Sequence, residues 1–379
     1  MKGRVQKYTL SNTIPKLHHL CQLSYTFRQG KLPLLATISR SAQKEFLEDC
    51  GRTLQLTSKV ELRLKGWYLP AIIPIVNSMS INLKLPDTRK LNSCLIVAPR
   101  GSGKTELLER TLAASNPEHF VVLPPKIFES ELVTKPRDYF HNKILVLDDL
   151  IVTFEGMSTK QRQQLVNFWT KLLEGGYARD RNAIVNVRTI VLFGLASEQL
   201  DKFRDELMSA TFLDRVPAFK HNVTPELKRE ILEYRASQSG DKKPDLKLPL
   251  PEKIEDREKI HVQFPHSKEI ESKIVEYALE LDNYEVQSSV RAQDYVKTFM
   301  RANALLNGRR KITESDLYLY DLIHHLFLNS MRELGPEKLI LSVIRKNPDG
   351  TDQELIESSG VSRGTFYKYK KILQHRNAF

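Results

Sequence analysis

The chain has 379 residues, a length that favours two or three domains. Hydrophobic residues make up 41% of it and aromatic residues 8%, so it can build packed cores and does not have the composition of a disordered protein. The net charge of +12 indicates a polyanionic partner; a solvated basic surface is the alternative interpretation.

The positive charge is concentrated near both ends of the chain. Residues 1–44 contain eight lysines and arginines and no acidic residue, and residues 362–379 contain five and none. Such segments suit a phosphate backbone, so DNA is the expected partner.

Cysteine content and hydropathy limit the cellular compartments in which the chain is expected. The three cysteines, Cys21, Cys50 and Cys94, form no CxxC pair, which argues against a disulfide framework and a zinc site and favours a reducing, cytoplasmic location, at the nucleoid in a prokaryote. No run of eighteen apolar residues and no signal-peptide pattern occurs, so no membrane partner is expected.

Five regions follow one another along the chain. Residues 1–65 form a basic N-terminal region with possible helices at 17–27 and 42–50. In residues 66–236, short apolar runs alternate with helical stretches at 105–114 and 159–174; the runs lie at 93–97, 120–123, 144–147 and 189–193. This alternation predicts an α/β fold with a parallel sheet and helices on both faces. The phosphate-binding motif at residues 98–105 makes the P-loop NTPase type of this sheet the expected one.

The remaining regions contain no apolar strand pattern. Residues 237–266 are polar and contain four prolines, as in a linker or surface excursion. Residues 267–330 show helical periodicity in three successive stretches and predict an α-helical lid. Residues 335–379 are expected to form a separate small helical unit.

A phosphate-binding motif joins the first apolar run to the first helix. Glycines there let backbone N–H groups turn toward phosphates, and the helix N-terminus adds positive potential. Lys104 would reach the β- and γ-phosphates of ATP, and the Thr105 hydroxyl would ligate Mg²⁺. Position 98 is alanine, where this motif usually has glycine. The alternative to a nucleotide site is a glycine-rich turn that contains a lysine by chance. The expected nucleotide-binding residues are Pro99, Arg100, Gly101, Ser102, Gly103, Lys104 and Thr105.

Two aspartates end an apolar strand 44 residues after Lys104. Asp148 is expected to hold Mg²⁺ together with Thr105, and Asp149 to polarise the attacking water. Asp149 is one methylene shorter than the glutamate that many relatives have at this place.

This order of elements, across residues 70–330, resembles the AAA+ ATPases, which are ring-forming motors and switches. The resemblance implies a homo-oligomeric ring, of which a hexamer is one form. Arg215, in the segment 212–216, looks like the arginine finger, and Arg291, in 289–295, is similar to the second sensor arginine. The alternatives are a surface salt bridge for Arg215 and an exposed helix-start residue for Arg291. The first sensor lacks its usual asparagine, and Ser197 is the nearest polar substitute.

Residues 173–188 look like the hairpin of the branch that contains minichromosome maintenance helicases and MoxR-type ATPases. In the helicases this hairpin faces DNA in the pore of the ring, which makes Arg179 and Arg181 candidate DNA contacts. A simple loop followed by a strand is the alternative.

Residues 335–379 have the pattern of a helix-turn-helix, winged-helix-like unit without a wing. Helices are expected at 336–346, 352–358 and 363–374, with a tight turn before the last. The candidate DNA contacts of the last helix are Arg363, Thr365, Tyr367 and Lys368, with Lys370 and Lys371 suited to phosphates. A protein-docking helical bundle is the alternative.

The leading hypothesis is therefore an ATP-hydrolysing, DNA-associated motor or switch in replication, helicase action or mobile-element maintenance. Two alternatives stay open: a MoxR-like protein-remodelling ATPase, and an ATP-regulated DNA-binding protein with little turnover.

Overall fold

A computed structural model describes most of the chain after residue 39. The expected helix at 17–27 and most of the one at 336–346 lie outside the described residues. The residues described are 40–85, 91–124, 140–154, 156–175, 177–180, 183–199, 212–237, 245–251, 259–283, 287–332, 340–341, 344, 347–348, 350–359 and 362–375.

A five-stranded sheet confirms the predicted α/β fold, with strand order β2-β3-β6-β1-β7 and every neighbouring pair parallel. The four predicted apolar runs are four of its strands. The fifth strand, β7, has only three residues and was not predicted. The strands are β1 (Cys94–Ala98), β2 (Phe120–Val122), β3 (Lys143–Leu147), β6 (Thr189–Ala196) and β7 (Ala218–Lys220).

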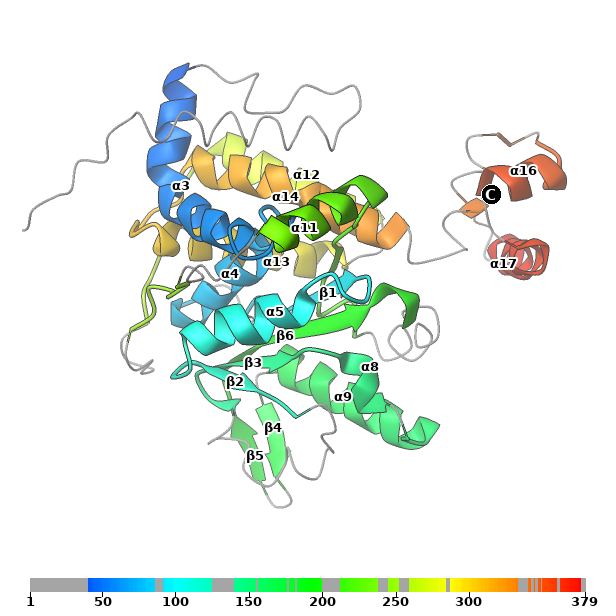
Figure 1. Cartoon of the computed structure of the whole chain (residues 1–379), viewed down its shortest axis with the longest axis horizontal. Coiled ribbons are helices and arrows are strands. Elements are labelled where there is room, and N and C mark those ends of the chain that lie inside the picture. Colours follow the sequence, from blue (N-terminus) through cyan, green and yellow to red (C-terminus); the bar gives the residue numbers. More distant parts are fainter. Residues whose placement is uncertain are drawn as a thin grey trace, which may run out of the picture.

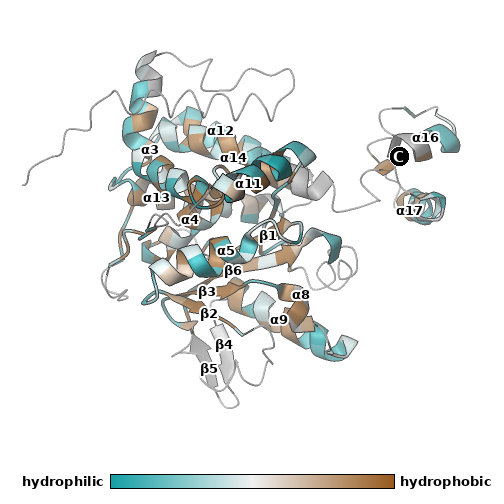
Figure 2. Ribbon diagram, in the orientation of Figure 1, coloured by the Kyte–Doolittle hydropathy of each residue, from teal (hydrophilic) through white to brown (hydrophobic). Residues whose placement is uncertain are grey.

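Helices cover the sheet on both sides (Figure 1), as the continuous apolar runs of its strands require. On one side lies α5 (Lys104–Leu107), which continues as a π-helical segment, Leu108–Ala113. On the other side lie α8 (Leu150–Phe154) and α9 (Thr159–Gly175). Figure 2 shows the apolar residues gathered on the central strands.

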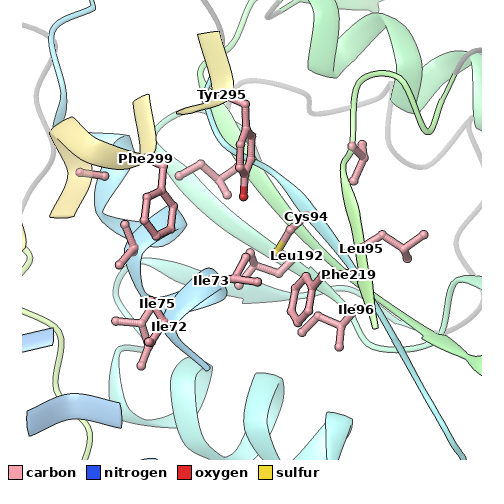
Figure 3. Packing of buried hydrophobic residues seen from close by; sticks show 14 of the residues in the cluster. Ile72, Ile73, Ile75, Cys94, Leu95, Ile96, Leu192, Phe219, Tyr295 and Phe299 are labelled. Atoms are coloured by element: carbon pink, nitrogen blue, oxygen red, sulfur yellow. The ribbon is translucent and has the colours of Figure 1, made fainter. Parts of the chain in front are cut away.

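A helical layer completes the core. It contains α3 (Arg40–Glu61), α4 (Ile72–Met79), α12 (Lys268–Asn283), α13 (Ser289–Leu306) and α14 (Glu314–Arg332). Isoleucines of α4 lie among side chains of β1 and β6 (Figure 3). Phe327 of α14 contacts Phe219 of β7 and Tyr295 of α13, with ring centroids 6.0 Å and 5.7 Å apart. The lid helices and the sheet therefore share one hydrophobic core.

Helix α3 belongs to this core as well. The Thr53 hydroxyl donates to the Asn303 side-chain oxygen at 2.7 Å, and Asn303 donates to Asp316 at 2.6 Å. Arg309 pairs with the same Asp316 carboxylate and donates to the backbone oxygen of Asp49. Residues 40–65, expected in the N-terminal region, are thus tied to the lid helices.

Outside these layers lie α11 (Pro225–Ser237) and a hairpin formed by β4 (Tyr177–Asp180) and β5 (Ala183–Asn186). The antiparallel register, with Tyr177 opposite Asn186, confirms the hairpin expected in this stretch. Within the described part of the chain, no helix is long and apolar enough to cross a membrane.

Candidate functional site

The phosphate loop, residues 98–105, connects the carboxyl end of β1 to the start of α5. Gly101 and Gly103 have φ values of 75° and 96°, in the left-handed region that side chains with a Cβ rarely adopt. The loop is closed by a hydrogen bond from the Ser102 N–H to the Pro99 oxygen at 3.2 Å. The backbone thus has the turn that the motif predicted.

Lys104 points back into the loop. Its ammonium donates to the backbone oxygens of Ala98 at 2.9 Å and of Pro99 at 3.2 Å, and only 8% of the residue is exposed. Burial lowers the pKa of Lys104, against the raising effect of the Asp148 and Asp149 carboxylates. A buried ammonium held by neutral carbonyls is well placed to exchange them for phosphate oxygens.

Asp148, directly after β3, meets Thr105 at the start of α5. The Thr105 hydroxyl donates to Asp148 Oδ2 at 2.5 Å. Burial raises the pKa of Asp148, while the Thr105 hydrogen bond and the Lys104 charge lower it. The other carboxylate oxygen, Oδ1, is buried and has no hydrogen-bond partner among the described residues. Such an atom is costly unless something binds it.

This oxygen chemistry fits Mg²⁺, which protein sites hold through one or two carboxylates with phosphate and water completing the shell. The described residues contain no cluster of three or more His, Cys, Asp and Glu side chains that could cage a metal without such help. Thr105 and Asp148 are thus suited to a nucleotide-bound Mg²⁺.

Asp149 has a structural contact next to this pair. Its Oδ1 accepts a hydrogen bond from the Val152 N–H at 3.4 Å, within the first turn of α8. A carboxylate at a helix N-terminus is stabilised there. The residue expected to orient water therefore also caps a helix.

Glu198, which sequence reasoning missed, lies at the phosphate loop. Its Oε1 accepts a hydrogen bond from the Arg100 N–H at 3.2 Å. Burial raises the pKa of Glu198, but hydrogen bonds from backbone N–H groups and the charges of Lys104 and Arg100 outweigh it, so the net shift is downward. The expected sensor, Ser197, is its half-buried neighbour.

The two candidate arginines meet at one carboxylate. Arg215 and Arg291 each place a guanidinium nitrogen 2.9 Å from a different oxygen of Glu174, in the last turn of α9. Arg291 also pairs with Asp214, which accepts a hydrogen bond from the Ser288 N–H at 2.7 Å. The lid helix α13 and the sheet domain are therefore joined through these charges.

A tryptophan lies behind the phosphate loop. The Trp67 indole N–H donates to the Ser102 backbone oxygen at 2.7 Å, and its ring lies 4.3 Å from the ring of His221. Burial and the nearby Lys104 charge lower the pKa of His221 to about 4. No motif marks Trp67 or His221 in the sequence.

The C-terminal unit has its own core of Ile340, Ile344, Leu355, Phe366 and Leu373, formed around α16 (Asp352–Ser359) and α17 (Arg363–His375). The Ser362 hydroxyl accepts a hydrogen bond from the Thr365 N–H at 3.3 Å and so caps the start of α17.

Helix α17 divides the expected DNA contacts into two groups. Arg363, Tyr367, Lys368 and Lys371 are exposed. Lys370 instead bonds to Asp352 of α16, and the Thr365 hydroxyl lies 2.8 Å from that of Ser362. The four exposed residues, Arg363, Tyr367, Lys368 and Lys371, form the open face of α17.

In the hairpin, Arg179 stands opposite Ile184, and Arg181 lies outside the described residues. The structure therefore leaves both candidate DNA contacts of the hairpin as predictions.

No family model and no curated protein matches this chain. Among solved structures it is similar to a full-length MCM homolog from Methanopyrus kandleri, at 14% identity and a TM-score of 0.49. The similar region covers 78% of this chain and 62% of that protein, so the chain spans less than two thirds of its length. The fold assignment here rests on the sheet itself.

Acid should destabilise the protein through His221. Its pKa is about 4 in the folded chain against 6.5 ordinarily, so between these values only the unfolded chain takes up the proton. The free energy of unfolding should therefore fall as the pH drops, by about 2.5 kcal/mol between pH 7 and pH 4.5 from this group. Urea unfolding of the wild type and of His221→Gln at both pH values measures it. Equal losses in the two proteins would contradict this.

Proposed function

We propose that this chain is an AAA+ type ATP hydrolase that acts on DNA as a motor or switch. The observation that carries the proposal is the constellation of Lys104, Thr105 and Asp148 at the carboxyl edge of a parallel sheet, with one Asp148 oxygen buried and unpartnered. Open α/β sheets bind ligands at this edge, near the point where strand order reverses. Here β1 is followed in sequence by β2, with β6 and β3 between them.

The triphosphate would lie along the phosphate loop and the start of α5. Backbone N–H groups and the helix N-terminus would bind its oxygens, and Lys104 would exchange the Ala98 and Pro99 carbonyls for the β- and γ-phosphates. Thr105 and Asp148 would hold Mg²⁺, which neutralises charge that develops on the phosphates. Asp149 would orient the attacking water from its position at the start of α8.

By the AAA+ resemblance, Arg215 would reach the γ-phosphate of a neighbouring subunit in a homo-oligomeric ring, and Arg291 would act as the second sensor. Their meeting at Glu174 supports this, because it gathers two guanidinium groups, 11% and 23% exposed, at one carboxylate that is 43% exposed. An arginine fork suits a transferring phosphoryl group. The alternative is that Glu174 only fastens the lid to the sheet domain.

DNA is favoured as the partner by the open face of α17, which combines three cations with Tyr367. The net charge of +12 points the same way. A MoxR-like protein-remodelling ATPase remains the second candidate, since hairpin and lid also resemble that group. ATP turnover measured with and without single- and double-stranded DNA separates the two candidates, because DNA should stimulate turnover only by an ATPase that acts on DNA.

Lys104→Ala should abolish ATP hydrolysis, because it removes the buried cation that would balance the phosphates. Lys273→Ala is the matched control, since Lys273 is an exposed residue of α12 that pairs with Glu276, one helical turn away. Phosphate release by purified full-length proteins is the measurement. Hydrolysis by Lys104→Ala at the rate of the control would overturn the site assignment.

Arg215→Ala and Lys104→Ala should complement each other when mixed. Each variant alone should be inactive, but a mixed interface can pair an intact phosphate loop with an intact arginine. At equal mixing about a quarter of the interfaces combine the two intact halves if assembly is random and pairwise. Hydrolysis by the mixture, with co-assembly checked by pull-down of a tagged variant, tests this. Co-assembly without recovery would show that Arg215 does not act across subunits.

The open face of α17 should bind duplex DNA in a salt-dependent way. Replacing Arg363, Lys368 and Lys371 together by Ala should reduce the log–log salt slope by about 3, one for each lost phosphate contact. The control replaces Arg229 and Lys273, which are exposed cations on other helices. Fluorescence anisotropy across a salt series is the measurement. An unchanged slope would move the role to residues 1–44 or the hairpin.

A further inference from the structure

The segment between α3 and α4, residues 62–71, passes behind the phosphate loop and holds it at one point. Trp67, whose side chain is fully buried, donates its indole N–H to the Ser102 oxygen at 2.7 Å. The geometry is that of a strong neutral hydrogen bond, and a buried bond of this kind is costly to leave unmade.

This bond fixes the direction of a phosphate donor. In a planar trans peptide, the C=O and the following N–H point in opposite directions. Because the Ser102 oxygen is held on Trp67, the Gly103 N–H points away from Trp67, toward the inside of the loop. Backbone N–H groups at this place in the motif are those that surround the phosphates.

The same side chains form the outer wall of the loop. A Cβ on Gly103 would lie 3.2 Å from a methyl carbon of Leu64 and 3.3 Å from the Trp67 indole nitrogen. The backbone of Gly103 also has a φ of 96°. Both the limited space and the backbone conformation therefore require glycine at this residue.

Trp67 is itself held on both sides. The Glu61 carboxylate accepts hydrogen bonds from the backbone N–H groups of Gly66, at 2.9 Å, and Tyr68, at 3.0 Å. Beside the indole lies the tilted ring of His221, whose backbone N–H donates to the Val97 oxygen of β1 at 2.9 Å. The indole is thus positioned by the end of α3 and by the strand that precedes the loop.

We propose that Trp67 is a positioning residue that keeps the phosphate loop in its phosphate-binding shape before the nucleotide arrives. This inference rests on the proposed nucleotide site. Preorganisation of this kind acts on binding, because the loop need not be ordered when the ligand enters. Losing the bond should weaken nucleotide affinity and leave the reacting groups, Lys104, Thr105 and Asp148, unchanged.

Trp67→Phe in the full chain is the first test, because it keeps the aromatic ring and removes the N–H. The dissociation constant for Mg-ADP, measured by calorimetry, should rise about tenfold, the effect of one hydrogen bond. KM for ATP should rise similarly, and kcat should stay within about twofold. Trp169→Phe is the control, since Trp169 is the other tryptophan and packs against Phe193, distant in sequence from the loop.

Three outcomes are distinct. Wild-type protein that binds no nucleotide would refute the proposed function. Wild-type binding with an unchanged dissociation constant in Trp67→Phe would overturn the positioning role alone. A lower melting temperature in Trp67→Phe with unchanged affinity and KM would show that Trp67 only supports the fold, which also overturns it.

A second measurement does not depend on Trp67→Phe being folded. The measurement is the proton NMR spectrum of Trp169→Phe. Because the chain has two tryptophans, Trp67 supplies the one indole N–H resonance that remains in this variant. It should exchange slowly with water. It should also shift downfield as Mg-ADP is added, since a phosphate bound to the Gly103 N–H polarises the same peptide and strengthens the indole bond. Rapid exchange, or no shift at saturation, would overturn the proposal.

Discussion

Two opposite charges lie at the carboxyl edge of the sheet, the buried Lys104 ammonium and the partly buried Asp148 carboxylate, and the local structure holds them there. Burial disfavours the charged form of both, lowering the pKa of Lys104 and raising that of Asp148. Each is only partly compensated, Lys104 by two backbone carbonyls and Asp148 by one hydroxyl. A site of this kind costs stability in the free protein and becomes favourable when a polyanion and a cation enter together.

The strand order is what brings these charges together. Strand β6 lies between β1, which leads into the phosphate loop, and β3, which ends before Asp148. At Gly194 of β6 a Cβ would lie 1.9 Å from the Asp148 backbone oxygen, a distance that no side chain tolerates. Glycine at this position therefore lets the end of β3 close onto the sheet and sets where the Asp148 carboxylate stands.

The parts of the molecule that were predicted from sequence are those coded by neighbouring residues. Apolar runs gave four strands, and the spacing of glycines with Lys104 gave the phosphate loop, because both patterns are complete within a few residues. The contacts that were missed join residues far apart: Trp67 and Ser102 are 35 positions apart, Arg100 and Glu198 are 98, and Arg291 and Glu174 are 117. No local pattern marks one partner of such a pair. The contact of Lys370 with Asp352 of α16 likewise has no local pattern that marks it.

Helix α3 connects these observations. Near its middle, Asp49 and Thr53 bind it to α13 and α14 through their contacts with Arg309 and Asn303, which both contact Asp316. Burial raises the pKa of Asp316 against the opposing effect of Arg309. At its C-terminal end Glu61 holds the segment that carries Trp67. The lid helices thus reach the proposed nucleotide site by two routes, through α3 to the back of the phosphate loop and through Arg291 to Glu174. Because packed helices move as rigid bodies rather than deform, a nucleotide that shifted the lid would have to carry α3 with it or break its polar contacts. Such a shift of α3 would reach the phosphate loop through the hydrogen bond from Trp67 to Ser102.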